Sequence, residues 1–311
     1  MKKKLITVVI LALAAMMVFT ACSTAPAASS APASSAAASS AAPASSAAPA
    51  SSAAATSAAP ASSAAALSGK VTMSGSTSME KVAKALAEDF MAKNPGVTVD
   101  VQLGGSSVGI ADATSGKVDI GNSSRALKDE EKAAGLVGHT ICLDGVALIV
   151  NPKNTASDLT KQQAIDIYTG KITNWKAVGG ADKPIVVIGR EASSGTRDAV
   201  ESILGIKDKA KYAQELNESG AVITAVSTTE NAIGYVSLDL IDSKVKALTL
   251  DKVAATEATI LDGTYLLQRP FVMATKGEKA SNATAQAFLD YTLSDAGREV
   301  IKGVKLILQP K

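Results

Sequence analysis

The hydrophobic pattern of this chain changes its period repeatedly, and each period predicts a different element. Alternation over residues 97–103 predicts a strand, and the β-branched run at 185–188 predicts a strand buried on both faces. An apolar stripe at helical spacing predicts a helix between Met79 and Phe90. Since strands and helices alternate along most of the chain, the pattern favours an α/β fold with mixed, mainly parallel sheets and helices on both faces.

The remaining elements follow from the same two periods. Further strands are predicted at residues 70–74, 117–120, 139–151, 231–236, 245–250 and 266–275, and Asp144-Gly145 is expected to interrupt the third of these. Further helices are predicted over a short stretch ending at 113 and over residues 128–134, 161–168, 196–204, 207–216, 282–293 and 295–302.

Four of the predicted strands end in glycine followed by serine or threonine, just where a helix begins. These turns lie at residues 75–78, 104–107, 121–124 and 189–196, and the last also carries Arg190. A helix start presents free N–H groups at the positive end of the helix dipole, which suits an anion. Serine and threonine also cap helices for purely structural reasons, so a single turn would carry little weight. Four turns and an arginine together indicate a convergent oxyanion site at the carboxyl ends of the strands.

The first 66 residues have a different character. Residues 1–21 combine three lysines with an apolar run too short to span a bilayer comfortably and predict a lipoprotein signal peptide, with Cys22 as the lipid-modified (palmitate-bearing) first residue. An ordinary secretory signal or an uncleaved anchor is the alternative. Residues 22–66 are almost wholly Ala, Ser and Pro and predict a disordered tether reaching about 35–40 Å.

Charge and composition exclude several functions. Without residues 1–21, 28 basic and 29 acidic residues remain, and no basic patch suggests a nucleic-acid partner. The only cysteines are Cys22 and Cys142, so with Cys22 lipidated no disulfide is expected. The sequence has no His/Cys cluster that would predict a metal, and no cofactor is expected.

Seven blocks of sequence, taken in order, resemble the phosphate-binding protein of the bacterial Pst ABC transporter, the PstS family. The blocks are GSTS (75–78), GGSSVG (104–109), DIGNSSR (119–125), DGVALIVNP (144–152), YTGKITNW (168–175), REASSGTRD (190–198) and AIGYVS (232–237). The resemblance implies a two-lobed periplasmic-binding-protein fold of type II, with the ligand in a cleft between the lobes. Lobe one would comprise residues 67–148 and 268–311, and lobe two residues 149–267.

The resemblance also implies a function and a set of site residues. The chain would be a monomeric, non-enzymatic solute-binding protein, lipid-anchored at the outer face of the cell membrane, that delivers inorganic phosphate to ABC permease subunits and their ATPase. The phosphate contacts carried over from the family are Thr77, Ser78, Ser106, Arg190, Ser194, Gly195 and Thr196, and Ser76 and Ser124 are further candidates in the same turns.

Two departures from the family concern how phosphate would be distinguished from sulfate. Familiar members place an aspartate, which accepts a hydrogen bond from a protonated phosphate, where this chain has Ser124. Members also often carry an acid two residues after the site arginine, where this chain has Ala192. The next residue, Arg125, could face the anion or pair with Asp129 four residues on. Asp144 is the first candidate for a replacement acceptor and Glu191 the second, although Asp144 is equally compatible with a turn role in its Asp-Gly pair.

Other functions are open at this stage. Sulfate or molybdate could occupy the same fold. A serine hydrolase is suggested by G-x-S-x-G at 105–109 and S-x-x-K at 78–81, but the only histidine, His139, begins an apolar strand. A P-loop reading of residues 189–196 lacks the required lysine. A tethered adhesin or sensor would use the same domain for display.

Overall fold

The structure is a computed structural model, and it describes residues 66–310, which belong to one compact unit. The predicted signal peptide, Cys22 and all of the predicted tether except its last residue lie outside the described residues. Among residues 66–310, no helix is both long and apolar enough to cross a membrane.

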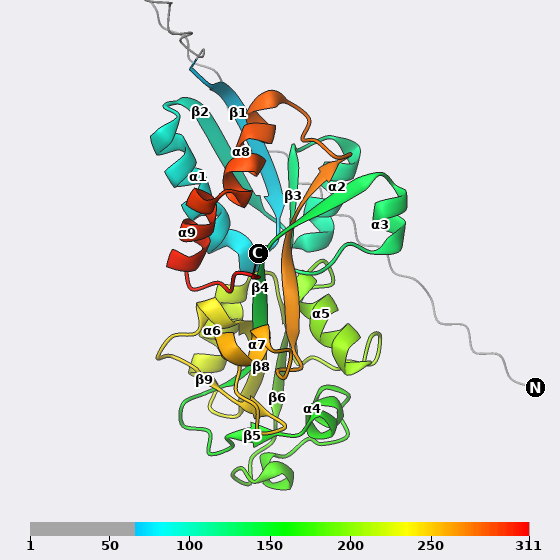
Figure 1. Cartoon of the computed structure of the whole chain (residues 1–311). Helices are drawn as coiled ribbons and strands as arrows, with labels where there is room; N and C mark the ends of the chain where they lie inside the picture. The colour runs from blue at the N-terminus through cyan, green and yellow to red at the C-terminus, as the bar shows by residue number, and fades with distance from the viewer. Residues whose placement is uncertain (1–65, 311) are drawn as a thin grey trace, which may run out of the picture. The chain divides into compact units, whose positions relative to one another are not determined.

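The described residues form an α/β structure in which strands and helices alternate (Figure 1). The main strands are β1 (Ser68–Gly75), β2 (Gly96–Leu103), β3 (Ile120–Ser123), β4 (Leu136–Val150), β6 (Val186–Arg190), β7 (Gln214–Leu216), β8 (Ala232–Ser237) and β11 (Gln268–Lys276). Three two-residue strands are β5 (Asp158–Leu159), β9 (Lys246–Ala247) and β10 (Thr249–Leu250). The helices are α1 (Glu80–Lys93), α2 (Ser106–Ser115), α3 (Asp129–Ala133), α4 (Lys161–Tyr168), α5 (Gly195–Leu204), α6 (Ser219–Thr228), α7 (Glu257–Leu261), α8 (Ala283–Leu293) and α9 (Asp295–Gly303).

The strands join in the order β2-β1-β3-β11-β4-β8-β6-β7, and the pairings are mixed. Strand β1 runs parallel to β2 and β3, and β6 runs parallel to β7 and β8. The central strands β4 and β11 are antiparallel to their neighbours. The predicted mixed α/β fold is therefore confirmed.

Strand β4 links the two halves of this sheet. It pairs with β11 as far as Gly145 and with β8 from Val146 onward, so one strand of 15 residues serves both halves (Figure 1). The predicted interruption at Asp144-Gly145 is wrong: the chain stays extended there and changes its partner. Gly145 fits because a side chain at this position would lie 2.5 Å from Ile260.

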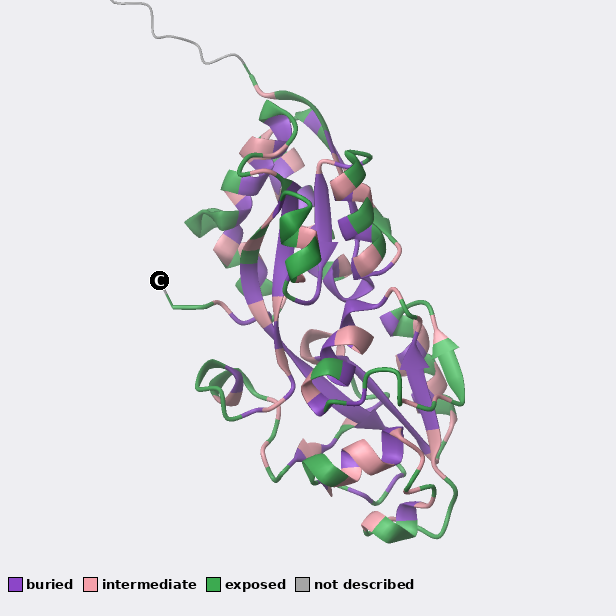
Figure 2. Ribbon diagram, turned by 90° about the vertical axis from the view of Figure 1, so that its right-hand side faces the viewer, coloured by how far each residue is buried: buried purple, intermediate pink, exposed green. Residues whose placement is uncertain are grey.

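Two large hydrophobic cores lie under separate sets of helices (Figure 2). One joins β1 and β11 to α1 and α8 through residues such as Met73, Phe271 and Phe288. The other joins β4 and β8 to α4 and α5 through residues such as Leu148, Tyr168 and Leu204. Separate cores are what a two-lobed fold requires.

Most of the predicted helices and strands are confirmed. The helix predicted at 207–216 is wrong, because this stretch contains turns and β7 instead. Helix α6, which begins at Ser219, was not predicted. Smaller differences are the strand at 117–120, which lies at Ile120–Ser123, and the strand at 245–250, which divides into β9 and β10.

Candidate anion-binding site

The four glycine- and hydroxyl-rich turns of the sequence come together in the structure. Ser78 Oγ, after β1, lies 2.7 Å from Thr196 Oγ1 on α5. Ser106 Oγ, at the start of α2, lies 3.2 Å from Ser124 Oγ, and it also accepts a hydrogen bond from the Ser124 N–H at 3.0 Å. All four side chains are buried. The convergence expected from strands that end at one edge of a sheet is therefore present.

Gly195 lets the turns of α2 and α5 approach each other this closely. A Cβ atom at Gly195 would lie 2.1 Å from Ser106 Oγ and 2.7 Å from Ser124 Oγ. The start of α5 is held locally by its cap, Ser194, whose hydroxyl accepts from the Arg197 N–H. A residue with any side chain would have to push Ser106 and Ser124 away.

Arg190 ends β6 and is almost completely buried. Its Nε and Nη2 atoms each lie 3.0 Å from an oxygen of Glu191, which balances its charge. Its Nη1 donates to Ser219 Oγ at 3.0 Å. The bidentate contact fixes the plane of the guanidinium, and Ser219 is presented by the first residue of α6.

A second buried arginine, Arg269 on β11, contacts the same group of hydroxyls. Its Nη1 donates to Thr196 Oγ1 at 2.7 Å. Its Nε donates to Asp144 Oδ2 at 2.9 Å, and its Nη2 lies 2.8 Å from the same oxygen. Burial lowers the pKa of Arg269, and the charge of Asp144 opposes this shift.

Ser78 is the point where these two sides meet. Its hydroxyl lies 2.7 Å from Thr196 Oγ1 and 3.3 Å from Ser219 Oγ. Thr77 Oγ1 also lies 3.4 Å from Ser219 Oγ, and Ser76 is buried beside them with its N–H bound to Asn122 O. The site thus combines hydroxyl groups from both halves of the sheet. We call the side chains of Thr77, Ser78, Ser106, Ser124, Thr196 and Ser219 the hydroxyl cluster.

The two further candidates, Arg125 and Asp144, contact other side chains of the protein. Arg125 donates to both oxygens of Glu131 at 2.8 and 2.7 Å, and its Nε lies 3.0 Å from Asp198 Oδ2. It therefore pairs with these two acids, whereas the sequence offered Asp129 as its partner. Asp144 uses Oδ2 for Arg269 and Oδ1 for Ser237 and the Leu238 N–H. Burial raises the pKa of Asp144, and Arg269 opposes that rise.

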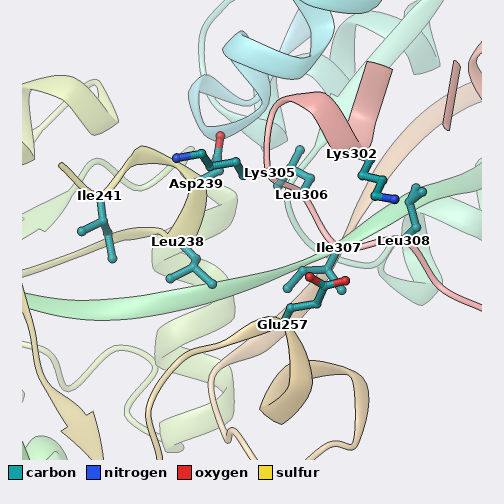
Figure 3. Close-up of a pocket in the computed structure, with 9 residues that line it drawn as sticks. All are labelled: Leu238, Asp239, Ile241, Glu257, Lys302, Lys305, Leu306, Ile307 and Leu308. Atoms are coloured by element: carbon teal, nitrogen blue, oxygen red, sulfur yellow. The ribbon is translucent and has the colours of Figure 1, made fainter. Parts of the chain in front are cut away.

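A cavity of about 320 Å³ adjoins the hydroxyl cluster and contains Glu191, the other acid considered at the sequence level. It is lined by Thr77, Leu103, Gly104, Glu191, Ser193, Asn217 and Glu218. A larger cavity of about 620 Å³ lies where Leu238, Asp239 and Ile241 face Lys302 and residues 305–308 (Figure 3). The hydroxyl cluster contributes no residue to the larger cavity.

Two side chains of this site were missed at the sequence level. Ser219 follows Glu218 at a helix start that carries no glycine turn, and Arg269 lies inside a strand. Only the hydroxyl of Ser219 at a helix start could have suggested a role. Nothing in the pattern of residues 266–275 distinguishes Arg269 from a surface arginine.

The chemistry available here is binding by hydrogen-bond donors. In the described part of the chain, no group of three or more His, Cys, Asp or Glu residues could hold a metal. His139, the chain's single histidine, has its Nε2 at 2.9 Å from Thr275 Oγ1, away from Ser106. Cys142 is a buried free thiol whose pKa is raised well above the ordinary value by burial.

Two lobes joined by crossing strands, with hydroxyls and arginines gathered at their junction, define a solute-binding protein for a small anion. A family model described as a PBP superfamily domain matches residues 23–296. A protein named phosphate-binding protein PstS in Bacillus subtilis is 36% identical over 224 residues, covering 70% of this chain and 73% of that protein. This chain belongs to the PstS family, as its sequence motifs indicated.

Solved structures agree with this assignment. A candidate phosphate ABC transporter substrate-binding protein from Clostridium perfringens, with bound phosphate, is 43% identical and has a TM-score of 0.75. The comparison covers 78% of this chain and 100% of that one. An ABC-type phosphate transport receptor from Vibrio cholerae is 35% identical with a TM-score of 0.66, covering 76% and 99%. The periplasmic-binding-protein fold is therefore confirmed.

Proposed function

We propose that this protein captures inorganic phosphate outside the cytoplasm and delivers it to an ABC permease. The observation that carries the proposal is the meeting of Ser78, Thr196 and Ser219 hydroxyls with Arg190 at the junction of the two cores. Charge-assisted hydrogen bonds of this kind contribute about 1.5–3 kcal/mol each. The phosphate-binding relatives support phosphate as the ligand.

The proposed phosphate contacts are Ser76, Thr77, Ser78, Ser106, Ser124, Arg190, Ser194, Gly195 and Thr196. Residues 67–148 with 268–311 would form one lobe and residues 149–267 the other, and binding would close them. The two separate cores support this division, with β4 passing between them. The closed shape is then what a permease would recognise. The protein would act by binding alone and catalyse no reaction.

Attachment to the outer face of the membrane through lipid on Cys22 completes the proposal. The signal-like residues 1–21 and the Ala/Ser/Pro-rich tether support it. Growth with labelled palmitate would test it: label on the wild type and none on Cys22→Ser is expected, and label on neither would contradict the anchor.

Sulfate is the alternative ligand, because Ser124 replaces the aspartate that in familiar family members accepts a hydrogen bond from protonated phosphate. We expect phosphate to bind at least a hundredfold more tightly than sulfate, a difference of about 2.7 kcal/mol. Titration calorimetry with each anion measures this directly. Equal affinities would remove phosphate selectivity from the proposal.

The role of Arg190 provides a second test of the same function. Arg190→Ala should abolish most phosphate binding, because it removes the guanidinium and leaves Glu191 without its partner. Arg298→Ala is the control, since Arg298 lies on α9 and donates to Gln309 O. Undiminished phosphate binding by Arg190→Ala would refute the site assignment.

A further inference from the structure

Two buried arginines each donate a hydrogen bond to a different hydroxyl group, and both hydroxyls lie next to Ser78. Arg190 Nη1 donates to Ser219 Oγ at 3.0 Å, and Arg269 Nη1 donates to Thr196 Oγ1 at 2.7 Å. Ser78 Oγ lies within hydrogen-bond distance of both of these hydroxyls. Arg190 matches a family position, whereas Arg269 enters the cluster from the start of β11, where it is the second residue.

The contact with Arg269 fixes the direction of the Thr196 hydroxyl. A guanidinium has five N–H donors and no acceptor, so Thr196 Oγ1 must accept in this bond. The single proton of Thr196 therefore points elsewhere, either to Ser78 Oγ at 2.7 Å or to an anion between the lobes. Because Thr196 Oγ1 accepts from Arg269, its proton stays available for donation to an anion.

The charge of Arg269 is balanced within the protein. Asp144 lies directly opposite it in the pairing of β4 with β11, with contacts of 2.9 and 2.8 Å to one carboxylate oxygen. Its other oxygen lies 2.7 Å from Ser237 Oγ and accepts from the Leu238 N–H at 3.3 Å. Both side chains are almost fully buried, so removing one partner would leave an uncompensated charge. The pair as a whole adds no net charge to the site.

We propose that Arg269, paired with Asp144, is a positioning residue that holds the Thr196 hydroxyl as a donor to the bound anion. This inference rests on the proposed phosphate-binding function and adds to it a residue outside the seven motifs. Its contribution to affinity comes from the orientation of Thr196 and is absent when that hydroxyl is absent.

A double-mutant cycle with inorganic phosphate tests this dependence. The variants of the full chain are Thr196→Val, the neutral pair Arg269→Gln with Asp144→Asn, and all three substitutions together. Each of the first two should bind phosphate at least tenfold more weakly in titration calorimetry. The triple variant should bind within about threefold of the weaker of them, because Arg269 has nothing to position once the hydroxyl is gone.

If the two losses of phosphate affinity multiply, to about a hundredfold in the triple variant, Arg269 acts independently of Thr196 and the inference is overturned. Wild-type affinity in the neutral-pair variant would overturn it as well. Thr196→Ser, which restores a hydroxyl, should recover most of the affinity that Thr196→Val loses. A wild-type protein without phosphate binding would overturn the proposed function and this inference together.

Two further variants separate positioning from simple loss of stability. Phe288→Leu alters the core beneath α8 and should lower the free energy of unfolding while phosphate affinity stays unchanged. If the neutral pair does not fold, Arg269→Lys replaces it in the cycle, because a single ammonium keeps the charge but cannot reproduce the fork that holds Asp144 and Thr196. The loss of phosphate affinity caused by Arg269→Lys should disappear when Thr196→Val is also present. A loss that persists there would contradict the inference.

Discussion

Asp239 shares one serine with a second carboxylate. Ser237 Oγ lies 2.7 Å from Asp144 Oδ1 and 2.5 Å from Asp239 Oδ1, and its single proton can serve only one of them. Burial and then the charge of Asp144 raise the pKa of Asp239 to about 6, and the hydrogen bond from Ser237 and the charges of Lys81 and Arg269 oppose the shift only in part. At neutral pH Asp239 is therefore ionised in the folded protein, although burial and Asp144 disfavour its charge.

This arrangement predicts a pH-dependent stability. Because the folded state retains the Asp239 proton up to about pH 6 and the unfolded state loses it near pH 4, the free energy of unfolding should fall between these values, by at most about 3 kcal/mol from this group. Asp239→Asn should reduce that fall in urea unfolding series measured from pH 4 to 7. Asp242→Asn, at an exposed position, is the control. Identical pH profiles for Asp239→Asn and the wild type would contradict the prediction.

Individual site residues could be predicted only where local sequence marks them. Ser78, Ser106 and Thr196 were found because each follows a glycine-containing strand end and opens a helix. Arg269 could not be found, because its role depends on Asp144, which lies 125 residues away and meets it only through the register of β4 and β11. Asp144 was suspected from its place before the crossover strand, but its arginine partner was not.

At the scale of elements, the first residues of helices α2 and α5 pack against each other and leave no space for a side chain at Gly195. Gly195, the first residue of α5, faces Ser106, the first residue of α2. Gly195→Ala should therefore weaken phosphate binding at least tenfold, because its methyl group would overlap Ser106 Oγ when the two turns meet. Calorimetry measures the affinity, and thermal unfolding checks that the variant is folded.

The chain contains a matched control for this substitution. Gly220, the second residue of α6, has no atom within 4 Å of the place where a Cβ would lie. Gly220→Ala is expected to keep wild-type affinity, and its helix can gain slightly in stability from alanine. An equal loss in both variants would show that helix starts in general, and not the contact between α2 and α5, limit binding.

The error at residues 207–216 shows how tertiary pairing overrides local preference. The stretch is rich in Lys, Ala, Gln and Glu, which favour a helix. In the structure Gln214–Leu216 instead pairs in parallel with Ile188–Arg190, and the ring of Tyr212 lies against Gly189. Strand β7 leads directly to α6, so the same error hid Ser219. The periodicity of a long helix such as α1, by contrast, sufficed to predict it.

At the scale of the whole molecule, several contacts join the two proposed lobes besides the hydroxyl cluster. The Ser107 N–H donates to Ser193 O at 3.0 Å, and Ser193 Oγ donates to Gly104 O at 3.1 Å. Arg125 lies 3.0 Å from Asp198 on α5 while Glu131 holds it from its own side. These contacts form between residues 67–148 and 149–267 and would be lost if the lobes opened.

The ion pair between Arg125 and Asp198 should therefore slow the release of phosphate. In Asp198→Asn the Arg125 side chain keeps Glu131 but loses its link across the lobes, at a cost of about 1 kcal/mol to the closed form. Stopped-flow measurement should show phosphate leaving about fivefold faster, with an unchanged association rate. Asp182→Asn is the control, because Asp182 pairs with Lys176 inside residues 149–267. Unchanged release from Asp198→Asn, or equal acceleration in both variants, would show that Arg125 acts only within its own lobe.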